Sequence, residues 1–91
     1  MTETKMLIGS LSNDLFRVAN MIYRKSPSAL TFFHEMYRWI GGLENVSVKQ
    51  YIQKILEDLQ SQKSNPKFTV EQAETYLMYG VLLKNYILHI G

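Results

Sequence analysis

The sequence predicts an all-α protein, a small single-domain antiparallel bundle of about four helices. Apolar residues recur at spacings of three and four along most of the 91-residue chain, which is the period of a helix that packs on one side. No stretch alternates with the two-residue period of a strand for long enough to form one. The connections between the periodic segments are short, which favours antiparallel neighbours in a bundle.

The first helix is expected over about residues 4–25. Its apolar face is formed by residues at helical spacing, namely Leu7, Leu11, Leu15, Val18, Ala19 and Ile22. The start is open between Thr4 and Leu11, because the glycine of Gly9-Ser10 weakens a helix at that point.

The second helix is expected over about residues 27–40. Ser26-Pro27 is typical of a helix start, because a proline at the first helical position lacks an N–H that would have no helical partner there anyway. Gly41-Gly42 is expected to end the helix, since glycine adopts the left-handed conformation of a helix C-terminus without strain. Aromatic residues surround most of this helix.

The third and fourth helices, over about residues 48–63 and 70–90, each begin with a predicted capping box. The spacing S/T-x-x-Q occurs at Ser47–Gln50 and again at Thr69–Gln72. The third helix has one apolar stripe opposite a charged side. The fourth is apolar on every side from Leu77 onward, and a helix of this kind is expected to be buried all round.

The second and fourth helices together predict a surface that a partner covers. Six tyrosines, four phenylalanines and one tryptophan are more than one small core readily hides, and a four-helix bundle leaves each helix a solvent side. Aromatic residues are also enriched at the centres of protein interfaces. The residues expected to meet the partner are Phe32, Trp39, Tyr79, Leu82, Leu83 and Tyr86. A second copy of the chain is favoured over a different protein or an apolar ligand, and burial of all these side chains within one monomer is the alternative.

Composition limits the function further. A net charge of +2 is too small to indicate nucleic-acid binding by itself. The chain has no cysteine, which excludes disulfide and thiolate chemistry. The first residues lack the pattern of a secretory signal, and the apolar run from Leu77 to Leu83 is far shorter than the ~20 residues that cross a bilayer. We therefore expect a cytoplasmic protein without membrane association.

The residues that carry metal or catalytic chemistry are sparse. The two histidines, His34 and His89, lie on different predicted helices, whereas a zinc site needs three or four converging ligands. His34-Glu35 begins like a zinc-protease helix, but Arg38 stands where the second histidine is required. We expect no metal, no cofactor and no enzymatic activity.

The end of the fourth helix resembles a nuclease motif. The segment from Lys84 to His89 is similar to the R-N-x-x-x-H signature of the HEPN ribonucleases, which are small dimerising helical bundles. The resemblance covers six residues, with lysine in place of arginine. It implies that Lys84, Asn85 and His89 from two protomers meet an RNA phosphate and its 2′-hydroxyl, although lysine lacks the planar fork of arginine. The preferred interpretation is that they are the polar positions of a C-terminal helix, whose negative end favours basic groups.

A second alternative function comes from a polar line on the first helix. Asn13, Arg17, Asn20 and Arg24 recur at helical spacing, and Lys25 adjoins them. Arginine and asparagine on one helix face are suited to phosphates or base edges, and also to an acidic protein partner. A nucleic-acid-binding regulator that uses Arg17, Arg24 and Lys25 is therefore kept as an alternative. The favoured function is a non-catalytic protein-interaction or regulatory module, either a homodimer or a subunit of a complex.

Overall fold

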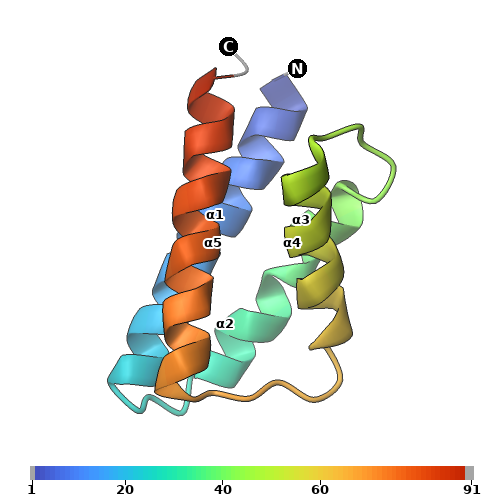
Figure 1. Cartoon of the computed structure of the whole chain (residues 1–91). Helices are drawn as coiled ribbons and strands as arrows, with labels where there is room; N and C mark the ends of the chain where they lie inside the picture. Colours follow the sequence, from blue (N-terminus) through green and yellow to red (C-terminus); the bar gives the residue numbers. More distant parts are fainter. Residues whose placement is uncertain (1, 90–91) are drawn as a thin grey trace.

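The computed structural model describes residues 2–89, and these form a helical bundle without strands. The helices are α1 (Thr2–Tyr23), α2 (Ala29–Glu35), α3 (Tyr37–Gly42), α4 (Gln50–Ser61) and α5 (Val70–His89). Figure 1 shows that α1 and α4 run in one direction, while α2, α3 and α5 return in the other. The predicted all-α antiparallel bundle is confirmed.

α1 is continuous through Gly9-Ser10 and ends two residues earlier than predicted. The backbone N–H of Lys25 donates to the carbonyl of Ile22 at 3.0 Å, and that of Ser26 donates to the carbonyl of Met21 at 2.9 Å. This pair of bonds is the Schellman arrangement that closes a helix C-terminus. Lys25 takes the left-handed position with φ 56°. A residue in the left-handed conformation cannot be part of a right-handed helix. Arg24 and Lys25 therefore lie in the turn that follows α1 and not on the helix as predicted.

The predicted second helix begins at Ala29 and not at Pro27, and it is present as two short helices separated at Met36. Met36 is fully buried and has φ −67° and ψ −17°, which is a tighter turn than an ideal α-helix. The expected left-handed end at Gly41-Gly42 is wrong, because α3 continues through both glycines and no described glycine has a positive φ. Leu43 follows as the C-cap, and its buried side chain joins the core.

The two predicted capping boxes have different outcomes. At the start of α5, half of the box forms: the backbone N–H of Gln72 donates to Thr69 Oγ1 at 3.1 Å, while the Gln72 side chain bonds to Gln62 and not back to Thr69. At the start of α4, no cap of this kind forms at Ser47, and the helix begins at Gln50 after an extended Lys49. α4 also ends at Ser61, so the predicted range 48–63 is too long at both ends. α5 matches its predicted range as far as His89, and Ile90 lies outside the described residues.

The core collects most of the aromatic residues within one monomer. Phe33 is fully buried, and its ring meets those of Tyr37 and Phe68 edge-on at centroid distances of 5.2 and 5.6 Å. Tyr76 is also fully buried beside it. Within residues 2–89, which contain all of the chain's Phe, Trp and Tyr residues, only Tyr23 and Tyr51 are exposed. The bundle therefore hides more aromatic surface than the sequence predicts.

Candidate functional site

The side of α5 that faces its own bundle is the side on which the sequence predicts a partner. Leu83 is 0% exposed and Tyr86 is 9% exposed, so their expected accessibility is wrong. The ring of Tyr86 meets that of Tyr51 on α4 edge-on, at a centroid distance of 6.2 Å. α4 thus supplies the cover that the sequence assigns to a partner.

Tyr79 and Leu82 are half-buried, because they lie at the border between that side and solvent. The Tyr79 hydroxyl donates a 2.6 Å hydrogen bond to Asp58 Oδ2 on α4. Burial, followed by this bond to a carboxylate, raises the pKa of Tyr79 above its ordinary value. The polar end of Tyr79 is therefore already paired within the monomer.

Asp58 belongs to a chain of hydrogen bonds that joins α4 to α5. Gln62 Nε2 donates to Asp58 Oδ2 at 3.0 Å, and Gln62 Oε1 accepts from the Tyr76 hydroxyl at 2.6 Å. Gln72 Nε2 donates to the same Gln62 oxygen at 3.0 Å. Burial raises the pKa of Tyr76 to about 12. Since each of these polar groups has a partner, we interpret this chain as a structural network.

Phe32 and Trp39 are half-buried and each carries a guanidinium over its ring. The carbon at the centre of the Arg17 guanidinium lies 5.4 Å from the Phe32 ring centroid, and that of Arg38 lies 4.6 Å from the Trp39 ring. Trp39 Nε1 also donates to Asp14 Oδ2 at 2.7 Å. These cation–π contacts cover part of both rings. The two rings therefore offer less free apolar surface than their residue types suggest.

The cations of the nucleic-acid alternative do not form one surface line on a helix. Arg17 is on α1, where its guanidinium lies 3.7 Å from Asp14 Oδ1 as well as over Phe32. Arg24 and Lys25 are exposed in the turn after α1. One of the three cations is thus engaged within the monomer, and nucleic-acid binding by these residues remains a prediction.

The residues of the nuclease alternative are all exposed on α5. Lys84 and Asn85 lie on its solvent side, and His89 is its last described residue. None of them lines the cavity between α3 and α4 or the cavity beside Gln62. Ribonuclease activity by these residues therefore stays a prediction.

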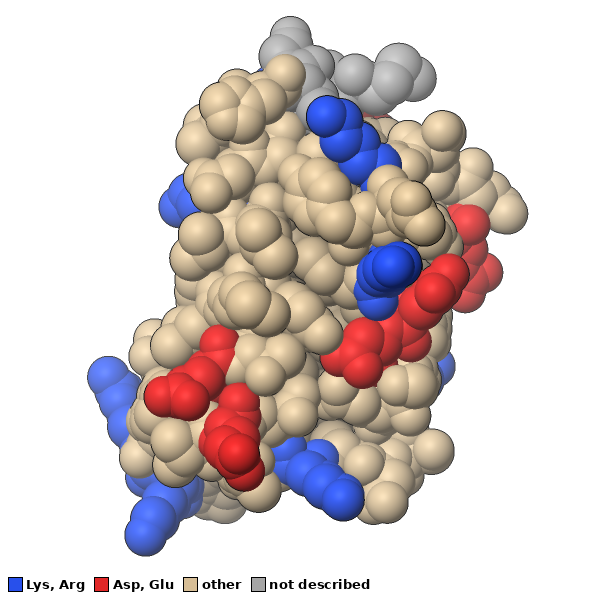
Figure 2. All heavy atoms as spheres, in the orientation of Figure 1, with Lys and Arg blue, Asp and Glu red and all other residues tan. Residues whose placement is uncertain are grey.

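α5 also presents an exposed apolar line, which we call the outer stripe. Four large side chains on it are far from buried: Val70 is 57% exposed, Met78 52%, Val81 49% and Leu88 69%. Glu74, Lys84 and Asn85 lie on the same exposed side. The outer stripe is defined by Val70, Glu74, Met78, Val81, Lys84, Asn85 and Leu88. Figure 2 shows a largely uncharged surface over the middle of α5, above acidic side chains near its start.

The sequence indicated that these residues share one face of a helix, but not that this face is exposed. Residues spaced by three and four lie on one side of a helix, so the set was recognisable as one face. The opposite face of α5 is equally apolar, however, and periodicity alone does not say which face the bundle covers. In the structure, α1 and α4 pack against the faces with Gly80 and Tyr86, and Val81 is left exposed.

Comparisons with protein-family models, with curated proteins and with solved structures each found no match. Within residues 2–89, no helix is long and apolar enough to cross a bilayer. In the same range, no group of three or more His, Asp or Glu side chains is placed to hold a metal ion. The exposed surface of α5 is therefore the feature from which a function is best inferred.

Proposed function

We propose that this chain is a non-catalytic protein-interaction module that associates with a second copy of itself through the outer stripe of α5. The observation that carries the proposal is the exposure of Val70, Met78, Val81 and Leu88 on one helix face. Clustered exposed apolar side chains mark association surfaces, whereas isolated ones are ordinary.

The outer stripe is complementary to itself when two copies of α5 run antiparallel. With the twofold axis placed midway between Met78 and Val81, Met78 of one copy faces Val81 of the other. The same register brings Val70 to within one residue of Leu88 of the second copy, an offset of roughly 1.5 Å along the axis. Each apolar residue of the stripe thus meets another apolar residue, as an isologous interface requires.

The charges of the stripe agree with that register. Glu74 of one copy faces the position of Lys84 and Asn85 in the second copy. α5 is acidic in its first turns, at Glu71 and Glu74, and basic toward its other end, at Lys84 and His89. A parallel pair places like charges together, whereas the antiparallel pair places opposite charges together and also opposes the two helix dipoles. The antiparallel pair is therefore the one that we propose.

Sedimentation equilibrium of the purified chain across about 1–500 μM tests the proposal, since a small interface of this kind is expected to bind in the micromolar range. The natural chain is expected to approach twice its monomer mass. Val81→Glu is expected to leave a monomer, because it places two carboxylates beside the axis. The matched control is Leu30→Glu, which introduces the same charge at an exposed leucine on α2 and is expected to leave the association unchanged.

A charge exchange tests the register itself. Lys84→Glu is expected to weaken association by about three- to thirtyfold, because Glu74 of each copy then faces the introduced carboxylate of the other. Adding Glu74→Lys to that variant is expected to restore association. A natural chain that stays monomeric throughout the range, or a dimer that Val81→Glu does not affect, would contradict the proposal.

A further inference from the structure

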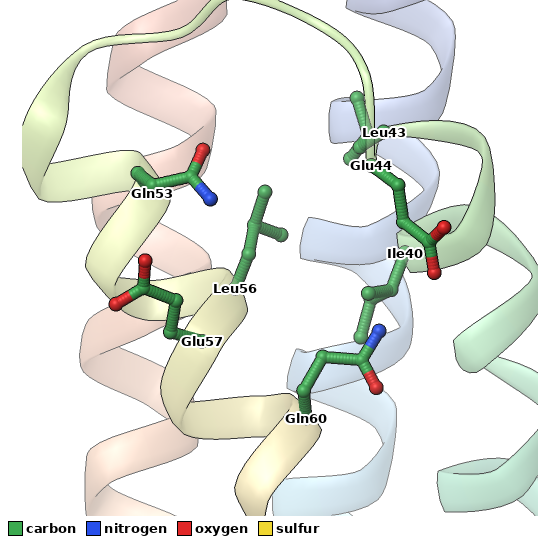
Figure 3. A pocket seen from close by; sticks show the side chains of 7 residues that line it. All are labelled: Ile40, Leu43, Glu44, Gln53, Leu56, Glu57 and Gln60. Atoms are coloured by element: carbon green, nitrogen blue, oxygen red, sulfur yellow. The ribbon is translucent and has the colours of Figure 1, made fainter.

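A groove beside α4 has an apolar floor and an acidic rim. It lies between α4 and the end of α3 with the turn that follows, and its volume is about 250 Å³. Ile40, Leu43 and Leu56 form the floor. Figure 3 shows Leu56 extending from α4 into the middle of the groove, with Ile40 and Leu43 on the opposite side.

The rim is formed by four exposed polar side chains, Glu44, Gln53, Glu57 and Gln60. Glu57 and Gln53 come from α4, and Glu44 comes from the turn after α3, so a carboxylate stands on each side (Figure 3). Within residues 2–89, neither carboxylate has a cation within 4.0 Å; the ion pair found there is Arg17–Asp14. Neither carboxylate at the groove is thus held in a direct ion pair within residues 2–89.

These observations define the chemistry of an occupant. Aliphatic side chains at the floor favour aliphatic groups, and the carboxylates of Glu44 and Glu57 on its two sides favour positive charge at the rim. Lysine and arginine combine both properties, because each has an apolar stem that packs on a surface and a charged end that reaches past it. Arginine is the better match, since its planar guanidinium donates to a carboxylate through two parallel N–H groups.

The length of the groove limits the size of the occupant. Gln53 and Gln60 are seven residues apart on α4, which corresponds to roughly 10 Å along the helix axis. An extended peptide of about three residues spans that distance. The exposed amides of both glutamines provide donors and acceptors for its backbone.

We infer that the groove binds a short basic and apolar segment of a protein partner, with basic side chains at Glu44 and Glu57 on its two sides and an aliphatic side chain over Leu56. The inference rests on the proposed binding function, but not on self-association. Insertion of the chain's own basic turn at Arg24 and Lys25 is the competing occupant. That contact would be head-to-tail and would build open chains, so the mass of the protein distinguishes it from a separate partner.

Titration of the ¹⁵N-labelled full chain with the blocked pentapeptide Leu-Arg-Leu-Arg-Leu tests the inference by NMR. Saturable amide shifts are expected at Leu43, Glu44 and residues 53–60, with a Kd of about 0.1–1 mM that rises with salt. The matched peptide Leu-Glu-Leu-Glu-Leu is expected to cause no shifts there. Equal binding of both peptides, or no shift with the arginine peptide at several millimolar, would overturn the inference.

Variants of the protein complete the test. Glu44→Gln with Glu57→Gln is expected to weaken binding at least about fivefold, since both charged hydrogen bonds lose their charge. The control is Glu3→Gln with Glu35→Gln, which removes the same charge from exposed positions outside the groove and is expected to bind normally. Unchanged binding by the first pair would refute the site.

The two proposals fail independently. Lys84→Glu is expected to disrupt self-association and to keep peptide binding, whereas the Glu44 and Glu57 pair is expected to keep the dimer mass. A pair variant that lost oligomeric mass would instead assign the groove to the chain's own basic turn and overturn the inference of a separate partner.

Discussion

The Ser12 hydroxyl on α1 donates a 2.7 Å hydrogen bond to the backbone carbonyl of Gly80 on α5, in the buried contact between the two helices. A serine that bonds directly to the backbone of another helix requires a close approach. Gly80 permits that approach, because a Cβ atom at this residue would lie 2.8 Å from Cε1 of Phe16. The α1–α5 contact therefore depends on the absence of a side chain at one position.

Gly80→Ala is expected to destabilise the bundle by about 1–3 kcal/mol, because the Phe16 ring must move away from the added methyl group. Urea denaturation followed by circular dichroism measures the change. The matched control is Gly41→Ala, since a Cβ atom at Gly41 meets nothing within 4 Å. There the higher helix propensity of alanine is expected to raise the free energy of unfolding by up to about 1 kcal/mol. Equal effects at the two glycines would show that helix propensity, and not the close contact, decides the result.

Lys25→Gly is expected to stabilise the protein by about 0.5–1 kcal/mol, although it removes a side chain. Lys25 has φ 56° in the turn that closes α1, a conformation that glycine adopts without the steric cost paid by other residues. The thermal midpoint measures the gain. Lys25→Ala is the control, because it removes the charge and keeps the strained backbone. A gain of the same size in the alanine variant would assign the effect to charge.

Asp58→Ala is expected to destabilise the protein by about 1–3 kcal/mol. The carboxylate accepts hydrogen bonds from Tyr79 and Gln62, and its loss leaves two partly buried donors without their partner. The neighbouring exposed Glu57 provides the control, since Glu57→Ala is expected to change the free energy of unfolding by no more than about 0.5 kcal/mol. Chemical denaturation of both variants compares them directly. Similar losses at the two positions would argue against a special role of the network.

Stability is expected to fall as the pH rises above about 10, the ordinary pKa of tyrosine. The pKa of Tyr37 is raised by burial and by the nearby Tyr76 and Asp58, and the pKa values of Tyr76 and Tyr79 are raised as well. Above about pH 10 the unfolded chain releases these protons while the folded chain retains them, so unfolding becomes more favourable. Each such tyrosine contributes at most about 1.4 kcal/mol per pH unit.

Denaturation between about pH 9 and pH 12 and the ultraviolet titration of tyrosinate together check this expectation. Three of the six tyrosines are expected to ionise late or only on unfolding. Tyr79→Phe is expected to make the pH dependence shallower, because it removes one of the retained protons. A titration in which all tyrosines ionise together near their ordinary pKa in the folded protein would contradict it.

Much of the fold followed from local sequence, because its causes are local. The three-and-four spacing of apolar residues determined where helices form, and the short connections determined their antiparallel order. The Thr69 hydroxyl caps the Gln72 N–H as predicted, since the two groups lie within one turn of each other, whereas the Gln72 side chain bonds to the more distant Gln62. The prediction that a helix ends at Gly41-Gly42 was wrong, because both glycines stay helical. The next residue, Leu43, packs in the core, and this tertiary contact is not visible in the local sequence.

The candidate site was only half determined by the sequence. The sequence by itself showed that α5 is too apolar for a helix with an ordinary solvent side, and so indicated a partner. Only the tertiary structure decided which face remains free: Leu83 and Tyr86 are buried, while Val81 and Leu88 are exposed. The reason is that both faces of α5 are apolar, so the sequence pattern does not indicate which face turns toward the bundle. The close approach of α1 at Gly80 and the packing of Tyr51 on Tyr86 determine which face is buried. Both contacts join residues that are far apart in the chain.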